Sequence, residues 1–260
     1  MDAATLNSKL ETFLRVATFP VGVKSLKAGE PLPSKAKRPK QDLGVEMAIC
    51  QAVAVARRYG WTLAFGREDV SCPIALAAFG FEPRNELYTS GTLAEGMYAS
   101  CREAGARFEA ALSKYEPNEY AAIVAGPLGR ITYEPDTVVV YGNPAQVLRL
   151  VNACLYEKGG SFKSEFSGRG DCTDLIIKGR KTGEPQLVLP CAGDRIFGMA
   201  ADDEMAFTFP FTMAEKVVEG LEKTHQGGLR YPVAQFLRFQ PEFPKPYVEL
   251  RKAWDAERKG

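Results

Sequence analysis

The chain has 260 residues with 33 basic and 32 acidic side chains, so its formal net charge at pH 7 is +1. Because there is no basic excess, the composition argues against a nucleic-acid-binding protein. No run of about 18 apolar residues is present, and the N-terminal segment lacks the basic and apolar regions of a signal peptide. These features predict a cytoplasmic protein with reduced thiols and no membrane partner.

The first half of the chain predicts helices that alternate with short strands. Leu6, Leu10 and Leu14 recur at four-residue spacing, which indicates an amphipathic helix. Pro73 favours a helix that begins there, because proline is tolerated in the first helical turn. The elements expected in this half are a helix over 2–16, a strand over 20–26, a helix with apolar residues from Val45 to Ala56, a strand over 61–65 and a short helix over 73–79.

Residues 27–41 combine three prolines with four lysines and an arginine. Proline interrupts regular structure, so this segment is predicted to be a mobile loop. Two interpretations of its charge stay open, a solvated connector and a basic lid over an anionic ligand.

The second half of the chain continues the alternation. Residues 136–142 form a near-continuous β-branched run, which is typical of a buried strand. Asn143 is a suitable N-cap and Pro144 a suitable first residue for the following helix, which Gly159 ends. The elements expected in this half are a helix over 92–114, a strand over 136–142, a helix over 144–158, strands over 186–190 and 204–210, and a helix over 211–223.

This order of elements predicts an α/β or α+β fold with a mixed sheet flanked by helices. Residues 1–226 are interpreted as a single α/β domain. Residues 227–260 are rich in proline and aromatic side chains, and they are predicted to form a C-terminal extension that wraps over the surface.

Two stretches of the sequence repeat one order of elements. Residues 51–72 and 146–172 each predict a helix, a glycine stop, a strand, a turn and a cysteine. An internal duplication of about residues 18–90 and 134–200 would place Cys72 and Cys172 at related positions. Whether the chain holds two related halves is open at this point.

Four of the six cysteines lie at predicted turns or helix starts, namely Cys50, Cys72, Cys172 and Cys191. Cys72 precedes Pro73, where free backbone N–H groups and the helix dipole favour a thiolate. Cys191 follows a predicted strand, a place where ligands bind in α/β sheets. A small buried residue is the alternative for each. The other two, Cys101 and Cys154, fall in predicted helices and are expected in the core.

The spacing of the four cysteines matches no CxxC pair and no standard zinc ribbon. A metal site would therefore have to be assembled in three dimensions. Thiolates without a nearby histidine suit a four-cysteine zinc site or an iron–sulfur cluster of the 4Fe–4S type.

Other polar motifs provide weaker candidates. Residues 193–195 present Arg195 as a fork for a carboxylate or phosphate, and residues 167–171 form a glycine-rich turn around Arg169. The acidic run 202–204 could bind a divalent cation, although a solvated turn is the plainer interpretation. The usual nucleotide-binding glycine motifs and the G-x-S-x-G motif are absent, and His225 is the single histidine, which argues against a serine–histidine triad.

A set of motifs in fixed order carries a family resemblance. They are PVGVK at 20–24, CQA at 50–52, EDVSCP at 68–73, NPAQ at 143–146, CAGDR at 191–195 and DE at 203–204. From about residue 15 to residue 223 the chain resembles the prokaryotic domain-of-unknown-function family 169. The resemblance implies a soluble protein, common in anaerobes, from a family without an established activity. Cys50, Cys72 and Cys191 belong to this pattern, and Cys172 matches it less closely.

Three hypotheses follow for the function. In the first, Cys50, Cys72, Cys172 and Cys191 bind an iron–sulfur cluster for electron transfer or for a cluster-dependent lyase or reductase. Arg195 and Lys24 would then contact the substrate.

In the second hypothesis, a two-lobed protein binds an anionic metabolite with Arg195, Arg169 and the 27–41 loop. In the third, the four cysteines hold zinc in a scaffold without catalysis. The expected partners are a small-molecule substrate or a redox partner protein, and self-association into a homo-oligomer is left open.

Overall fold

The computed structural model describes residues 1–233 and 241–258. Its centre is a six-stranded sheet with the order β2-β3-β1-β4-β6-β5, and every ladder between these strands is antiparallel. The predicted α+β class is therefore confirmed. The expectation of a mixed sheet, with both parallel and antiparallel strand pairs, is wrong, because the six strands pair only antiparallel. The strands are β1 Val21–Leu26, β2 Leu63–Phe65, β3 Ala122–Pro127, β4 Thr137–Gly142, β5 Gln186–Val188 and β6 Met205–Pro210.

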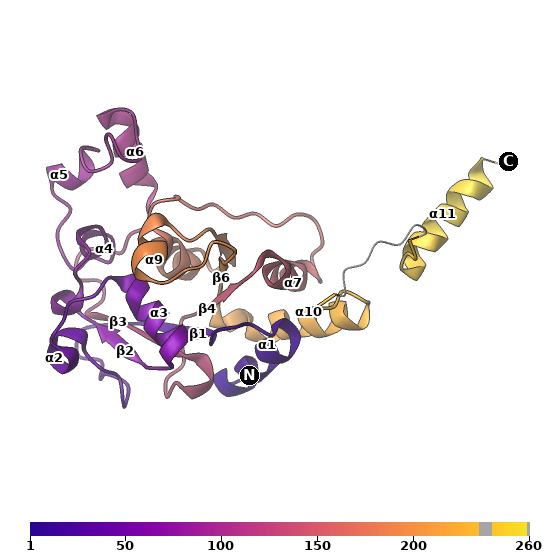
Figure 1. The fold of residues 1–260 in the computed structure, drawn as a ribbon, viewed down its shortest axis with the longest axis horizontal. Helices are drawn as coiled ribbons and strands as arrows, with labels where there is room; N and C mark the ends of the chain where they lie inside the picture. The colour runs from indigo at the N-terminus through magenta and orange to yellow at the C-terminus, as the bar shows by residue number, and fades with distance from the viewer. Residues whose placement is uncertain (234–240, 259–260) are drawn as a thin grey trace.

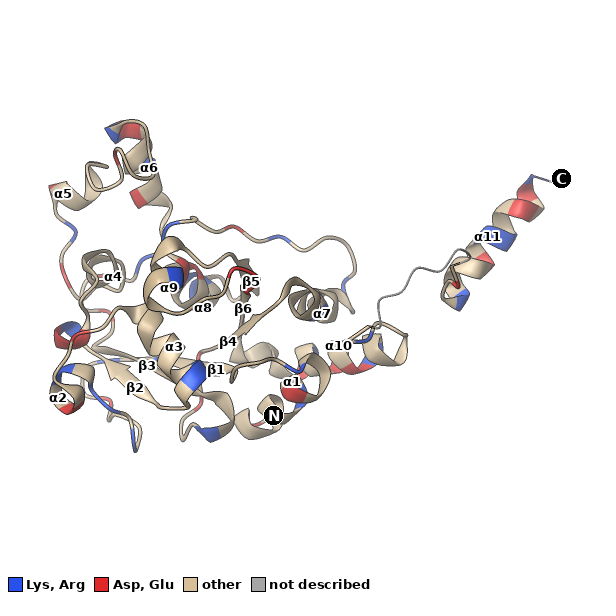
Figure 2. Cartoon of the chain, viewed as in Figure 1, with Lys and Arg blue, Asp and Glu red and all other residues tan. Residues whose placement is uncertain are grey.

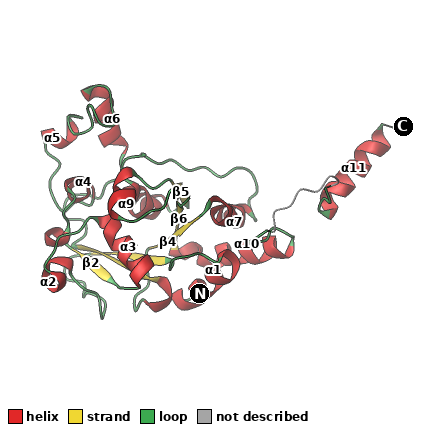
Figure 3. Cartoon of the chain, in the orientation of Figure 1, coloured by secondary structure: helices red, strands yellow, loops and turns green. Residues whose placement is uncertain are grey.

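Helices cover both faces of the sheet (Figures 1 and 3). Successive strand side chains point to opposite faces, so Val139 and Tyr141 enter one core and Val138 and Val140 the other. Double burial explains why the strand sequences are nearly continuous apolar runs. The first face carries α3 Ile49–Tyr59, α4 Pro73–Ala78, a helix over 171–182 and α9 Ala192–Phe197, and the second carries α1 Ala3–Leu14, α7 Pro144–Leu155 and α10 Ala214–Gln226.

The helix starts that carry strong local signals lie where they were predicted. Pro73 begins α4 and Pro144 begins α7. The Asn143 side chain accepts a hydrogen bond from the Gln146 N–H at 3.0 Å, and Gln146 Oε1 accepts one from the Asn143 N–H at 2.8 Å. This reciprocal capping box satisfies two backbone donors that the helix itself cannot pair.

The expected helix over 92–114 is wrong in its first half. Residues 92–101 form turns, and α6 Arg102–Ala111 begins only after Cys101, which caps it and is half-buried. Gly91 and Gly96 have φ values of +85° and +75°, which interrupt a right-handed helix. Two further short helices are α2 Pro39–Leu43, which precedes α3, and α5 Glu86–Thr89, which precedes α6.

Six of the described helices and strands were not anticipated from the sequence. They are α2, α5, β3, the helix over 171–182 with a π-helical turn at Thr173–Lys178, α9, and α11 Lys245–Glu257. In place of an extension wrapped over the surface, α11 buries none of its residues and stands away from the sheet (Figure 1). No helix in the described part of the chain is long and apolar enough to cross a membrane.

The two halves of the sheet pair in the same register. The first residue of β1 pairs with Pro127, the last residue of β3, and the first residue of β4 pairs with Pro210, the last residue of β6. The short edge strands β2 and β5 each pair with the second to fourth residues of β3 and β6. This equivalence supports an internal duplication, in which the strand order β2-β3-β1 is repeated as β5-β6-β4.

The repeated register changes which cysteines correspond. Cys50 and Cys172 each lie near the start of the helix that precedes the edge strand of its half. Cys72 and Cys191 each cap the first α-helix after that strand. The structure therefore relates Cys72 to Cys191, whereas the sequence comparison paired Cys72 with Cys172.

Gly220 provides a test of the packing on the second face, where α7 and α10 lie side by side. A Cβ at this position would stand 2.2 Å from the Ala153 carbonyl oxygen. We expect Gly220→Ala to lower the free energy of unfolding by about 1–3 kcal/mol, because the overlap exceeds the gain in helix propensity. Urea unfolding measures the change. Gly227→Ala, with no atom closer than 3.4 Å to its Cβ, should have little effect, and equal losses would refute the packing argument.

Candidate functional site

The four cysteines singled out from the sequence all lie at N-terminal ends of helical segments. Cys50 is the second residue of α3, and Cys172 is the second residue of the helix over 171–182. Cys72 and Cys191 are the caps of α4 and α9. These segments belong to the first face of the sheet, so the fold gathers thiols that are up to 141 residues apart in the chain.

The interactions of the thiols place them in one neighbourhood. Burial raises the pKa of Cys50, with smaller contributions from Asp194 and Asp171 and then from the nearby Cys191 and Cys72. Burial also raises the pKa of Cys172, with smaller contributions from Asp171 and then from the nearby Cys50, Cys191 and Cys72. Cys50 Sγ lies 3.9 Å from the carbonyl oxygen of Gly193, two residues beyond Cys191. All four thiols are free and half-buried. Among the described residues, no three His, Cys, Asp or Glu side chains are already arranged around a single ion position.

Three of the thiols are held in the protonated form. Burial raises the pKa of Cys50 and of Cys172 well above the ordinary thiol value. Burial, followed by the negative charge of Asp171, raises the pKa of Cys191 to about 12. Desolvation therefore outweighs the favourable backbone N–H groups at these positions, and the unliganded thiols are weak nucleophiles at neutral pH.

A pair of buried carboxyl groups lies beneath Cys191. Asp171 and Asp194 are 2% and 1% exposed, and a hydrogen bond joins their side chains. Asp171 Oδ1 accepts hydrogen bonds from Cys191 Sγ at 3.1 Å and from the Cys172 N–H at 2.8 Å. Burial and the charge of Asp171 raise the pKa of Asp194 to about 8. The pair therefore holds a proton at neutral pH, since two like charges so close cannot both be buried.

A buried cation completes this network. Tyr141 donates its hydroxyl proton to Asp194 Oδ2 at 2.7 Å, and the Arg57 guanidinium lies 4.1 Å from the centre of the Tyr141 ring. Arg57 is 1% exposed and forms two hydrogen bonds to Glu204, at 2.8 and 3.0 Å. The acidic run 202–204 thus provides Glu204 as an ion-pair partner of Arg57.

The sequence analysis missed Arg57, Tyr141 and Asp171 in this network. Arg57 lies in a predicted helix and Tyr141 in a predicted strand, so both resemble ordinary residues of those elements. Asp171 was seen only as the end of a flexible turn. Two sequence features could have indicated a buried polar network near the cysteines. They are the adjacent Asp171 and Cys172 and the charged residues just after Cys191.

The three cationic residues predicted to bind substrate, Arg195, Arg169 and Lys24, lie in different parts of the structure. Arg195 lies on α9, four residues after Cys191, where Nη1 donates to the Ala201 carbonyl at 2.7 Å. Arg169 is buried in an ion pair with Glu109, with its guanidinium 5.2 Å from the centre of the Tyr98 ring. Its charge is therefore already paired.

Lys24 lies on β1 next to Val23, whose side chain enters the core on the cysteine-bearing face. The alternation of strand side chains directs Lys24 to the opposite face. Of the three predicted cations, Arg195 lies on the helix that Cys191 caps, and its partly exposed guanidinium forms an ion pair of 3.6 Å with the exposed Asp202.

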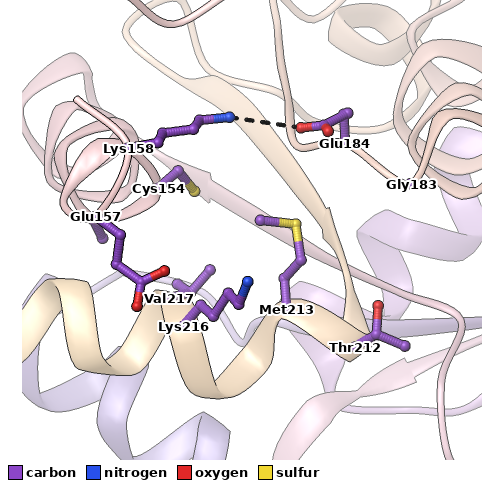
Figure 4. Close-up of a pocket in the computed structure, with 10 residues that line it drawn as sticks. Cys154, Glu157, Lys158, Gly183, Glu184, Thr212, Met213, Lys216 and Val217 are labelled. Carbon is purple, nitrogen blue, oxygen red and sulfur yellow. Dashed lines mark ion pairs between the residues drawn. The ribbon is translucent and has the colours of Figure 1, made fainter. Parts of the chain in front are cut away.

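A cavity of about 460 Å³ lies on the second face, between α7 and α10 (Figure 4). The sulfur of Cys154 lies at its wall, and Lys158 and Glu184 form an ion pair of 3.8 Å across its rim. Burial raises the pKa of Cys154 to about 12, and its side chain packs against the core of this face. This cavity is separate from the four-thiol site.

Comparisons with known proteins show the family of this chain. The sequence profile of the DUF169 family, described as Uncharacterised ArCR, matches residues 9–220. The chain belongs to the DUF169 family. The uncharacterized protein MJ0308 of Methanocaldococcus jannaschii is 29% identical over 209 residues, which cover 79% of this chain and 88% of that protein. No solved structure matches the chain. The DUF169 match includes all four cysteines and excludes α11.

The Arg57–Glu204 pair of this DUF169 protein predicts a pH-dependent stability. Burial alone would raise the pKa of Glu204, but hydrogen bonds from Arg57 and Ala201 and the nearby guanidinium charges lower it overall. A lowered pKa stabilises the fold above the unfolded value of about 4.3, and this stabilisation disappears as the pH falls through the folded value. We expect Glu204→Gln to cost about 3 kcal/mol at pH 7, because it leaves a buried guanidinium unpaired.

Urea unfolding between pH 3 and 7 measures this effect, and the difference from wild type should shrink at the acidic end. Glu46→Gln is the matched control, since it breaks the exposed ion pair between Glu46 and Lys40. It should leave the unfolding free energy nearly unchanged. A loss in Glu204→Gln no larger than in this control would contradict the proposed burial of the pair.

The carboxyl pair predicts the reactivity of Cys191. In the wild-type protein, alkylation of Cys191 by iodoacetamide should be slow at pH 8 and accelerate as the pH approaches 12. Asp171→Asn removes the adjacent negative charge and should lower this pKa, which speeds alkylation at pH 8. Peptide mass spectrometry gives the rate for Cys191. Asp203→Asn, at an exposed carboxylate, should leave it unchanged, and wild-type reaction as fast as a free thiol would disprove the assignment.

Proposed function

We propose that this DUF169 protein binds an iron–sulfur cluster through Cys50, Cys72, Cys172 and Cys191. The observation that carries the proposal is that four helix starts, from two equivalent halves of the fold, bring four thiols into one neighbourhood. Cysteine thiolates are the usual ligands of such clusters. The cluster would serve electron transfer or a lyase or reductase reaction, with Arg195 as a partly exposed cation for an anionic substrate.

The two metal candidates differ in how closely the four sulfurs must approach each other. Zinc–sulfur bonds of about 2.3 Å in a tetrahedron require all four sulfurs to lie within about 4 Å of each other. Among the described residues, no group of three or more His, Cys, Asp or Glu side chains is arranged to hold a metal ion. Several irons and sulfides form a larger core, which holds its thiolates farther apart.

The surroundings of the site moderate its negative charge. Four thiolates around one centre need compensating positive charge, and the N–H groups at helix starts provide part of it. The proton held by the Asp171–Asp194 pair keeps one carboxyl group neutral at pH 7. Because the thiols of Cys50, Cys172 and Cys191 are protonated without a ligand, cluster assembly would release protons and would be favoured by higher pH.

Anaerobic purification and analysis of iron, acid-labile sulfide and zinc tests the proposal. We expect iron and sulfide in similar amounts, with a visible absorption band, in the wild-type protein. Serine at position 50, 72, 172 or 191 should remove most of both. Cys101→Ser and Cys154→Ser are matched controls that should retain the cluster, because these residues lie outside the four-thiol group.

The other outcomes are equally clear. Zinc without sulfide, lost in the same four variants, would replace the cluster by a zinc scaffold. A protein that holds neither metal after reconstitution, or that keeps its iron in all four variants, would overturn the proposal.

A further inference from the structure

The basic loop that follows β1 packs against the second face of the sheet, at its β2 edge. The Lys37 N–H donates to the Thr62 carbonyl at 3.0 Å, and the Ala64 N–H donates to the Lys37 carbonyl at 2.9 Å. These bonds attach the loop alongside β2. Ala36 and Tyr133 cover a small apolar cluster that includes Leu26 and Val124. The loop is therefore anchored, and Figure 2 shows basic residues along it.

Two cavities adjoin beneath and beside this loop. One of about 250 Å³ is lined by Lys35, Lys37, Trp61 and Arg130, and one of about 340 Å³ is lined by Lys24 and residues 30–33. They share the lining residues Ser34, Thr132 and Tyr133. Ser34 Oγ and Thr132 Oγ1 lie 3.3 Å apart, so two hydroxyl groups stand where the cavities meet.

The cations of these cavities have no ion-pair partner in the described part of the chain, and the carboxyl side chain of Glu30 lines the larger cavity. Lys24, Lys35, Lys37 and Arg130 take part in none of the ion pairs found among the described residues. Aromatic rings hold two of them without cancelling their charge. Lys37 Nζ lies 4.4 Å from the centre of the Trp61 ring, and the Arg130 guanidinium lies 4.8 Å from that of Phe19.

The backbone conformation of Lys35 also supports a binding site at these cavities. Its φ of +68° is in the left-handed region, which is unfavourable for a residue with a Cβ. Such conformations are retained where the surrounding structure needs them, and they gather at binding sites. Here the conformation places a lysine at the wall of a cavity that already holds two other cations.

We propose that these two cavities bind a small phosphorylated metabolite with at least two negative charges. Phosphate oxygens accept several charge-assisted hydrogen bonds at once, and unpaired lysines, an arginine and two hydroxyl groups provide the donors. The cavity sizes suit a small metabolite. Trp61, which is 46% exposed, can pack against a planar part of the ligand. The site lies on the face opposite the thiols and stands independently of the proposed cluster.

Titration with pyrophosphate tests this site. The chain has two tryptophans, so Trp254→Phe leaves Trp61 as the sole reporter of fluorescence. We expect saturable binding at low salt by calorimetry, together with a change in Trp61 emission. Lys37→Gln and Arg130→Gln should each weaken binding by about tenfold, because each removes a charge-assisted contact.

Lys27→Gln is the matched control. It removes the same charge from the same loop but lies outside both cavities, so the affinity should not change. An equal loss in this control would show a diffuse charge effect and overturn the proposal, as would the absence of saturable binding. Citrate binding as tight as pyrophosphate binding would overturn the assignment to phosphate. Unchanged pyrophosphate binding in Cys72→Ser is expected, and it separates this site from the cluster proposal.

Discussion

The antiparallel pairing of β1 with β4 is the constraint on which the rest of the structure depends. Val21 pairs with Val139 and Gly22 with Val138, which joins the two halves of the sheet at its centre. Gly22 allows close packing there, since a Cβ would stand 2.7 Å from the end of the Ile131 side chain, which would have to shift. Because the remaining strands pair in equivalent registers on either side, the helix starts of both halves arrive on the same face. The position of the four thiols on one face of the sheet is a consequence of this pairing.

The polar network beneath the thiols is costly for the fold. Arg57, Asp171 and Asp194 are almost completely buried, and burying charged groups weakens stability unless they are paired. Each has a partner here, and the pKa of Asp194 is raised to about 8. Strongly shifted groups beside a set of thiols are a pattern more common at functional sites than in plain cores. The network therefore supports a chemical role for this face of the DUF169 protein.

The two faces of the sheet present different chemistry. One gathers protonated thiols around a buried carboxyl pair, and the other carries unpaired cations beside exposed Trp61. The proposed cluster site and the proposed phosphate site make separate demands on the chain, because they are built from different residues on opposite faces of the sheet. The DUF169 match covers the elements of both faces but not α11, so the exposed C-terminal helix is outside the shared part of the chain.

Elements with strong local signals could be predicted from the sequence. The starts of α4 and α7, the strand β4 and the apolar stripe of α1 all depend on residues within one or two turns of each other. The strand β3 escaped prediction because Ala122–Pro127 contains alanine, glycine and proline, which have low strand propensity, and its neighbours in the sheet impose its conformation. The same holds for the helix over 171–182, where glycines and charged residues obscure the pattern.

The sequence by itself determined which cysteines merited attention, since helix-start and strand-end signals are local and marked all four. Only the tertiary structure decided that they lie on one face of the sheet and that Cys72 corresponds to Cys191. It also decided that Lys24 points to the opposite face and that Arg169 is already paired with Glu109. It also decided the protonation of the site, because burial and the partners of Asp194 and Arg57 come from distant segments. Arg57 and Glu204 are 147 residues apart in the chain, so their ion pair depends on how α3 and the residues before β6 are placed in the fold. No local sequence pattern specifies that placement.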